Sequence, residues 1–353
     1  MHNPALPISR QSHLETLAYA YQRPIASAQM RENDEDFRVQ EILSFEPSGN
    51  GNHIYLYVQK RQLTTEELTK IIAQWANVDP RQVGYAGLKD RNAITSQWFS
   101  VDLSGKSEPH WQQLQSDRIA VLKISRHERK LKQGSVKANL FHLTLRNLQG
   151  DIAQLEERLI QVKHRGVPNY FGEQRFGSDE NNLTAAYQMF ASGRKVKNRH
   201  LRGLYYSAAR SYLFNLVLSY RLSLDRWDRA IHGDAMILDG SRSFFVADTI
   251  DNSIEQRLQS GDIHPSGPLW GKGEPATQGE ARTAELHALR DCRQWMQGLE
   301  AHGLEQQRRA LRVLVKEFEW AFDAQDELHL SFALPSGAYA TSVVRELVLV
   351  LSA

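Results

Sequence analysis

The pattern of hydrophobic residues changes twice along the chain, and this restricts the fold more than any other feature. Residues 36–60 contain two alternating, β-like runs around a Gly- and Asn-rich turn, which predicts a hairpin. Residues 64–77 have a helical pattern with a capping-box spacing from Thr64 to Glu67. Helical periodicity dominates residues 180–310, apart from one expected hairpin around residues 239–240. The chain is therefore predicted to combine helices and strands.

Strand-like runs return near residue 311, and a helix is expected in the closing segment ATSVVRELVLVL. A β-rich start, a helical middle and a β-rich end have two explanations. The outer parts form one sheet with the middle inserted, or two domains follow each other. The insertion is favoured because one sheet then accounts for both β-rich parts.

Composition excludes several classes of protein. The 353 residues suffice for two domains, and 41% hydrophobic with 24% charged residues is typical of a folded protein. The single cysteine, Cys292, excludes an intrachain disulfide and a Cys-rich metal site. The first twenty residues lack the apolar core of a signal peptide, and no stretch approaches about 18 apolar residues. A cytoplasmic protein that does not enter membranes is expected.

Positive charge collects in two stretches, although the net charge is only +2. Residues 123–146 contain seven Lys or Arg and one acid, and residues 194–210 contain six and no acid. A single basic cluster is usually a solvated surface. Two clusters with interleaved aromatic residues favour a polyanion, with RNA and DNA both open. The expected RNA-binding residues are Arg129, Lys130, Lys132, Arg194, Lys195 and Lys197.

Residues 87–101 read GLKDRNAITSQWFSV and place Asp90 between two cations on a turn before a β-rich run. An aspartate in a turn is more often structural than catalytic, because its side chain bonds the nearby backbone. The segment resembles the signature of the tRNA pseudouridine synthase D (TruD) family, Gly-x-Lys-Asp-basic-x-Ala-x-Thr-x-Gln. The matching residues are Gly87, Lys89, Asp90, Arg91, Ala93, Thr95 and Gln97.

Four further blocks resemble this family in the same order, so the resemblance covers residues 30–347. They are EDFRVQE, HERKLKQGSVKANLF, PNYFGEQRFG and ALPSGAYATSVVREL. The resemblance implies an α+β fold: a pseudouridine synthase-type catalytic domain with a central mixed, largely antiparallel sheet, and a mainly helical inserted domain. Residues 1–164 and 313–353 are expected to form the catalytic domain, and residues 165–312 the insertion.

The resemblance also implies the reaction. Members of the family isomerise uridine to pseudouridine in tRNA, at position 13 of the D arm, by breaking the N-glycosidic bond and rejoining the base through C5. This chemistry needs no net redox change and consumes no water, so no cofactor and no metal is expected. The expected partner is tRNA. No protein partner is expected, and the chain is predicted to be a monomer.

Asp90 is expected to be the catalytic residue. An ionised carboxylate beside the ribose acts as a nucleophile at C1′ or as a base that removes a ribose proton, and both routes remain open. A nearby cation favours the ionised form. Adjacent side chains on an extended strand point to opposite faces. Lys89 and Arg91 are therefore not favoured as partners of Asp90. The resemblance implies that Arg345 pairs with Asp90, because it lies in the last block, where pseudouridine synthases place a basic residue near the catalytic aspartate. Lys89 is expected to contact the substrate.

The target uridine must be extruded and held, because it is unlikely to react while stacked in RNA. The resemblance assigns this role to Phe37, Asn139, Phe141 and Tyr339, although the two phenylalanines could equally be core residues. Tyr339 stands where the family has phenylalanine, so its hydroxyl needs a partner if buried. Ala138 replaces a usual glycine. Arg175 is predicted to bind RNA, with a structural role at a domain junction as the favoured alternative.

Three functions other than RNA isomerisation are possible for a chain of this composition. A non-catalytic RNA-binding or RNA-folding protein would need the basic stretches but not an ionised Asp90. A nucleotide-dependent enzyme is disfavoured because no Walker-type loop occurs and neither glycine-rich segment joins a strand to a helix. A metalloenzyme is disfavoured because the 13 histidines show no HExxH or comparable spacing.

Overall fold

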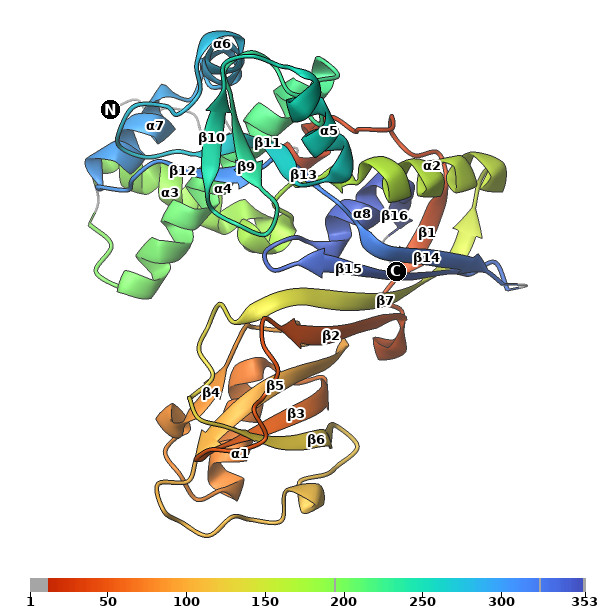
Figure 1. Ribbon diagram of the computed structural model, residues 1–353, viewed down its shortest axis with the longest axis vertical. Coiled ribbons are helices and arrows are strands. Elements are labelled where there is room, and N and C mark those ends of the chain that lie inside the picture. Colours follow the sequence, from red (N-terminus) through yellow and green to blue (C-terminus); the bar gives the residue numbers. More distant parts are fainter. Residues whose placement is uncertain (1–11, 194, 324, 352–353) are drawn as a thin grey trace. The chain divides into compact units, whose positions relative to one another are not determined.

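The computed structural model describes residues 12–193, 195–323 and 325–351, which form two compact units (Figure 1). The sheet unit comprises Ile25–Leu155, Val315–Gly337 and Val348–Ala353. The described residues of the helix-rich unit fall within 12–24, Glu156–Leu314 and Ala338–Leu347. Residues 12–24 and 338–347 thus pack with the helix-rich unit, whereas the predicted boundaries assign them to the other domain. The division into a catalytic and an inserted domain stays a prediction.

A mixed sheet of ten strands forms the sheet unit, with the order β14-β15-β7-β2-β5-β3-β6 along its main path. β1 pairs with β7 and β16, and β4 pairs with β5. Most pairs are antiparallel, while β2–β5 and β1–β16 are parallel. The predicted mixed, largely antiparallel sheet is therefore confirmed. Its strands are β1 (Ser27–Met30), β2 (Phe37–Leu43), β3 (His53–Arg61), β4 (Val83–Tyr85), β5 (Ile94–Asp102), β6 (Ile119–His127), β7 (Val136–Gln149), β14 (Lys316–Phe322), β15 (Leu328–Pro335) and β16 (Leu349–Leu351).

The prediction that the two outer parts of the chain share one sheet is confirmed by β15. It comes from the end of the chain and pairs antiparallel with β7 from Leu328 opposite Leu145 to Pro335 opposite Ala138. β7 also pairs with β2, so it joins early and late segments. Figure 1 shows β15 and β14 continuing the sheet beyond β7.

The predicted hairpin in residues 36–60 is wrong, although both of its strands exist. β5 lies between β2 and β3, and pairs parallel with β2 and antiparallel with β3. The nine residues between β2 and β3 exceed the two to five that close a tight hairpin. β5 is buried from Ile94 to Val101. A strand that is buried on both faces is suited to the interior of a sheet.

The first helix, α1 (Thr65–Trp75), begins where the capping box predicts. The Thr64 hydroxyl accepts a hydrogen bond from the Glu67 amide at 3.1 Å, and the Glu67 carboxylate accepts one from the Thr64 amide at 2.7 Å. Leu68 and Ile72 of α1 belong to a buried cluster with residues of β3 and β5. The helix therefore covers one face of the sheet.

The helix-rich unit contains most of the helices and two small sheets. α4 runs through its core, with Leu213, Phe214 and Val217 buried. The predicted hairpin around residues 239–240 is confirmed, because β9 and β10 pair antiparallel. The helices are α2 (Ile152–Arg165), α3 (Asn181–Ser192), α4 (Arg199–Ser223), α5 (Asn252–Ser260), α6 (Gly279–Ala288), α7 (Arg293–Ala301) and α8 (Ala340–Leu347). The strands are β8 (Val167–Pro168), β9 (Asp234–Leu238), β10 (Phe244–Ala247), β11 (Ile263–Leu269), β12 (Gln307–Ala310) and β13 (Arg312–Val313).

The closing helix is shorter than predicted. α8 ends at Leu347, and the last residues form β16, which pairs parallel with β1. Within the described residues, no helix combines the length and apolar character needed to cross a membrane.

Candidate active site

The loop between β4 and β5 carries Asp90 and is fixed by hydrogen bonds to the interior. The side-chain amide of Gln97 donates a hydrogen bond to the Gly87 carbonyl at 3.1 Å. The Thr65 hydroxyl donates one to the side-chain oxygen of Gln97 at 2.9 Å. The Lys89 amide donates to the same Thr65 hydroxyl at 3.0 Å. Gln97 is 0% exposed. The loop therefore has a defined conformation immediately before Asp90.

Lys89 holds this loop through a buried ion pair. Its ammonium lies 2.6 Å from Glu41 on β2, and the two side chains are 7% and 0% exposed. Glu41 also accepts a hydrogen bond from the Trp98 amide at 3.1 Å. Moving the Lys89 ammonium out of this pair would leave the Glu41 charge buried without its cation, which is costly. This position argues against the predicted contact of Lys89 with substrate and indicates that Lys89 positions the loop.

Lys60, on β3, contacts the backbone of Asp90. No sequence motif indicated this residue. It is 0% exposed, and its ammonium donates to the carbonyl oxygens of Leu63 and Asp90 at 2.6 Å each. Burial lowers the pKa of Lys60 to about 8, and the Asp90 charge opposes this shift. The alternating pattern Ile54, Leu56, Val58 could have placed Lys60 on the buried face, because side chains two residues apart share a face.

The Asp90 carboxylate is paired with Arg31, the residue after β1. Asp90 Oδ2 lies 3.0 Å from Arg31 Nη2, and the side chains are 32% and 27% exposed. Arg31 has a φ of +67°, which is uncommon for a residue other than glycine, so its backbone is strained where it serves the site. Its guanidinium also lies 3.9 Å from the centre of the Phe37 ring.

Arg345 was expected to be the cation beside Asp90. Within the sheet unit the structure pairs Asp90 with Arg31, and a contact of Arg345 with Asp90 stays a prediction. Arg345 is on α8 in the helix-rich unit, where it donates to the carbonyls of Leu17 and Ala18 and to the Glu346 carboxylate. Its guanidinium lies 3.6 Å from the centre of the Tyr19 ring. These contacts indicate that Arg345 stabilises its own unit. Arg31 lies just before the family block EDFRVQE, so no motif indicated it.

Buried aromatic rings line the same face of the sheet as Lys60 and Glu41. Phe37 and Phe141 are 3% and 7% exposed, with ring centres 6.1 Å apart. Phe141 stacks on Phe332 of β15 at 5.4 Å. The rings form a packed layer, as expected for core residues. A contact between their edges and an extruded base stays a prediction.

Three buried polar atoms near this layer have no hydrogen-bond partner in the described part of the chain. They are Asn139 Oδ1, Thr95 Oγ1 and Arg31 Nε. In the strand register, Asn139 lies opposite Glu41 and Thr95 opposite Lys60, so both side chains share the face that carries the loop. Buried polar atoms are normally satisfied. A polar ligand that fills this face would satisfy them.

Tyr339 lies in the helix-rich unit, where its hydroxyl has the partner that the sequence left open. It accepts a hydrogen bond from Arg175 Nη2 at 2.9 Å, and Arg175 Nη1 donates to the Ser207 hydroxyl at 2.7 Å. The Tyr339 ring packs edge-on against Phe171 at 6.2 Å. Arg175 thus links the PNYFGEQRFG block to the last block, which supports the structural alternative over the predicted RNA contact.

We expect Tyr339→Phe to lower the free energy of unfolding by about 1.5–3 kcal/mol, because one hydrogen bond to a charged group is lost. Urea unfolding of this variant, of Arg175→Met and of the double variant measures the coupling between the two side chains. Additive effects of the two substitutions would show that the bond contributes nothing.

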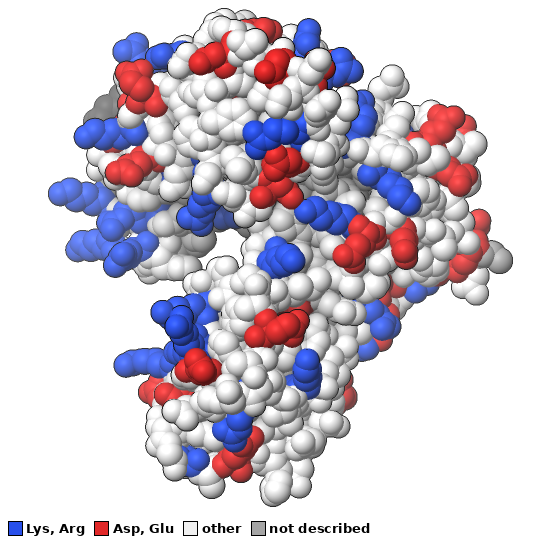
Figure 2. Space-filling model, in the orientation of Figure 1, with Lys and Arg blue, Asp and Glu red and all other residues white. Residues whose placement is uncertain are grey.

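The predicted RNA-binding residues lie in two loops. Arg129 and Lys132 are exposed between β6 and β7, whereas Lys130 is half-buried and donates to the Arg81 carbonyl. Lys195 and Lys197 are exposed between α3 and α4, and Arg194 lies outside the described residues. Figure 2 shows Lys and Arg side chains gathered over the region of α3 and α4. Their contact with RNA stays a prediction.

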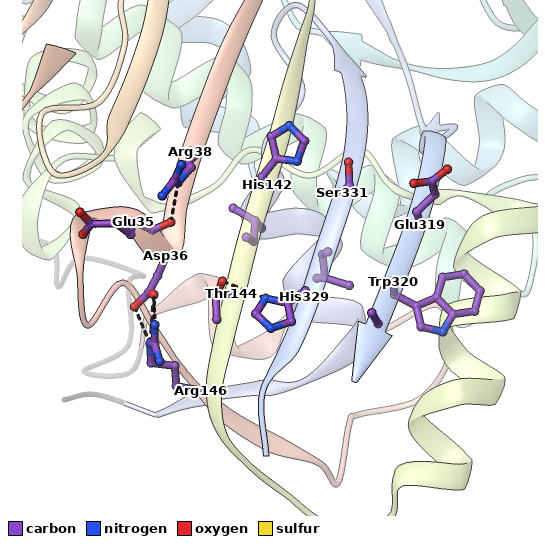
Figure 3. Close-up of a pocket in the computed structure, with 13 residues that line it drawn as sticks. Glu35, Asp36, Arg38, His142, Thr144, Arg146, Glu319, Trp320, His329 and Ser331 are labelled. Carbon is purple, nitrogen blue, oxygen red and sulfur yellow. Dashed lines mark hydrogen bonds and ion pairs between the residues drawn. The ribbon is translucent and has the colours of Figure 1, made fainter. Parts of the chain in front are cut away.

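The opposite face of the sheet has a hollow of about 490 Å³ that the sequence did not indicate (Figure 3). Arg38 and His142, neighbours in register on β2 and β7, point into it, away from Phe37 and Phe141. Arg146 at its edge is paired with Asp36 at 2.8 Å. Asp90 does not line this hollow, so the hollow is separate from the candidate active site.

Comparison with a solved structure identifies the fold. The crystal structure of a protein from Methanosarcina mazei, described as a candidate tRNA pseudouridine synthase D, matches with a TM-score of 0.74. The match covers 93% of this chain and 95% of that one at 22% sequence identity. The two chains therefore share a fold, which confirms the predicted α+β class.

Comparison with protein families and curated proteins identifies the relatives. The family model described as tRNA pseudouridine synthase D (TruD) matches residues 13–189 and 180–347. The tRNA pseudouridine synthase D of Nitrosococcus oceani is 49% identical over 95% of this chain and 94% of its own, and that of Methylococcus capsulatus is 47% identical over the same shares. These matches define an isomerase of the pseudouridine synthase class. The chain belongs to the tRNA pseudouridine synthase D family, as its motifs predicted.

Proposed function

We propose that this enzyme converts uridine to pseudouridine in tRNA, at position 13 of the D arm, through Asp90. The observation that carries the proposal is the Asp90 carboxylate, which is partly exposed, paired with Arg31 and held on a loop fixed from the interior. The relatives' names supply the tRNA substrate. The expected position in the D arm comes from the family resemblance. We also propose that the enzyme acts as a cytoplasmic monomer.

The reaction breaks the bond between C1′ and N1 and forms one between C1′ and C5. Asp90 either attacks C1′ and displaces the uracil, or removes the C2′ proton to give a glycal. The detached uracil then turns, C5 bonds to C1′, the C5 proton is released and N1 ends protonated. When C5 bonds to C1′, the C1′–Asp90 bond breaks in the first route, and Asp90 returns the proton to C2′ in the second. Either route uses the carboxylate of Asp90, and the Arg31 guanidinium contacts that carboxylate at 3.0 Å.

The unpartnered polar atoms supply a way to hold the detached base. Asn139 Oδ1 can accept a hydrogen bond from uracil N3, and the Thr95 hydroxyl can donate one to a uracil carbonyl. Phe37 and Phe141 supply the apolar floor beside them. This assignment keeps Phe37, Asn139 and Phe141 as substrate-binding residues.

The test is tritium release from tRNA labelled at uridine C5, because formation of the new C–C bond expels that hydrogen. The purified enzyme should release one tritium per modified uridine, and mapping of the product should place pseudouridine at position 13. The alternative is a non-catalytic RNA-binding or RNA-folding protein. It predicts no release above an Asp90→Asn control, with RNA binding retained.

The exposed lysines between α3 and α4 give a prediction about binding. Replacing both Lys195 and Lys197 by alanine should flatten the dependence of log K on log salt by about 1.4–1.8, because each phosphate contact contributes about 0.7–0.9. The control is Lys70→Ala with Lys272→Ala, which removes two exposed lysines outside both basic stretches. Equal slopes for the wild type and the Lys195 and Lys197 variant would exclude phosphate contacts at these positions.

A further inference from the structure

Leu88 is the most exposed large hydrophobic side chain in the described part of the chain, at 66%. It lies two residues before Asp90 on the same loop. A single exposed leucine usually needs no explanation. Leu88 is unusual because it lies beside the candidate catalytic residue Asp90. From this position a side chain could reach the RNA next to the reacting nucleotide.

The backbone on both sides of Leu88 is fixed, so its exposure does not come from a loose loop tip. The Gly87 carbonyl accepts from Gln97, and the Lys89 amide donates to Thr65. Lys89 itself points inward to Glu41. Leu88 and Asp90 are both more exposed than Lys89 between them.

An enzyme that acts on an extruded nucleotide must offset the stacking energy lost when the base leaves. Proteins do this by inserting an apolar side chain such as leucine between base steps. Two residues of extended chain span at most about 7 Å, and stacked bases on one strand lie about 3.4 Å apart. A side chain at position 88 can therefore enter the gap while the carboxylate at position 90 faces the extruded ribose.

We propose that Leu88 is a wedge that occupies the place of the target uridine in the RNA stack while Asp90 acts on that uridine. The proposal rests on the proposed function and adds a residue that determines how the nucleotide is extruded. Leu88 has no polar group and touches none of the reacting atoms. It therefore contributes by stabilising the RNA conformation in which the target uridine has left the stack.

The experiment measures single-turnover tritium release by Leu88→Ala, Leu88→Met and the wild type on two tRNA substrates. One is the unmodified tRNA, and the other carries an abasic site next to the target, which removes a stacking partner. Leu88→Ala should be about tenfold slower on the unmodified tRNA and within about twofold of the wild type on the abasic substrate. Leu88→Met should retain the wild-type rate on both, because methionine fills the same gap.

Leu122→Ala is the matched control, since Leu122 is 52% exposed in the same unit but lies on β6. 2-Aminopurine placed next to the target reports unstacking, and its fluorescence rise should be smaller with Leu88→Ala. An equal penalty on both substrates would overturn the wedge and assign Leu88 to contact with the uracil. An unchanged rate on the unmodified tRNA would also overturn it. If the wild type releases no tritium, the proposed function fails with it.

Discussion

Asp90→Asn should lower the rate of pseudouridine formation by at least about a thousandfold, because neither nucleophilic attack nor removal of a ribose proton is possible with an uncharged amide. The fold should be unaffected. Lys60 bonds to the backbone carbonyl of Asp90, which asparagine retains. The lost ion pair with Arg31 is partly exposed, so it should cost less than about 1 kcal/mol of stability.

Single-turnover tritium release measures this effect, with thermal unfolding and RNA affinity as checks that the variant is intact. Asp90→Glu is the informative second variant, because it keeps the charge and moves the carboxylate by one methylene. It should be slow as well, since the reacting group must lie at a defined distance from C1′. Substantial activity in Asp90→Asn would mean that another residue performs the chemistry.

The loop that carries Asp90 could be recognised from the sequence because a whole signature surrounds this residue, and the structure explains what most of that signature does. The catalytic role of Asp90 stays a prediction. Gly87, Lys89 and Gln97 fix the loop through hydrogen bonds and a buried ion pair. Ala93 is 0% exposed at its end. Most of the motif therefore encodes the rigidity of the loop, and Asp90 supplies its one carboxylate.

The partners of Asp90 could not be predicted, because they come from separate strands. Arg31 follows β1 with a backbone conformation that no local pattern indicates, and Lys60 is a cation at a position where the alternation predicts an apolar residue. The misplaced hairpin has a similar cause. Local periodicity identified β2 and β3, but the insertion of β5 between them depends on long-range pairing.

Asp90 lies close to two cations that differ in one physical respect. Arg31 is partly exposed and stays charged at all ordinary pH values, whereas Lys60 is buried with a pKa of about 8. A buried ammonium is destabilising by itself. If Asp90 is the catalytic residue, as we propose, we expect the charge of Lys60 and its bond to the Asp90 carbonyl to support the reaction.

Lys60→Met should therefore lower kcat by about tenfold to a hundredfold, which corresponds to about 1.4–2.7 kcal/mol of transition-state stabilisation. Methionine has a similar length but neither charge nor donor, so the carbonyls of Leu63 and Asp90 lose their partner. Lys70→Met on α1 is the control, because Lys70 is exposed. Its rate should equal that of the wild type.

The pH dependence separates the electrostatic role of Lys60 from a purely structural one. The charged groups that act on it are Asp90, Lys89 and Glu67, and its folded pKa of about 8 lies below the ordinary 10.5. Between these values the unfolded chain holds a proton that the folded chain has released. The Lys60 contribution to stability therefore rises with pH across this window, by at most about 1.4 kcal/mol per pH unit.

Activity should change in the opposite direction, because the charge beside Asp90 disappears as Lys60 loses its proton. The wild type should show a fall in kcat with a midpoint near pH 8, and Lys60→Met should lack that fall and retain a low, constant rate. Measuring kcat and thermal unfolding of both proteins from pH 7 to 10 tests both halves of the argument. If Lys60→Met shows the same fall in kcat at alkaline pH, the fall belongs to another titrating group. If the fall is absent from Lys60→Met, the charge of Lys60 supports the reaction at Asp90.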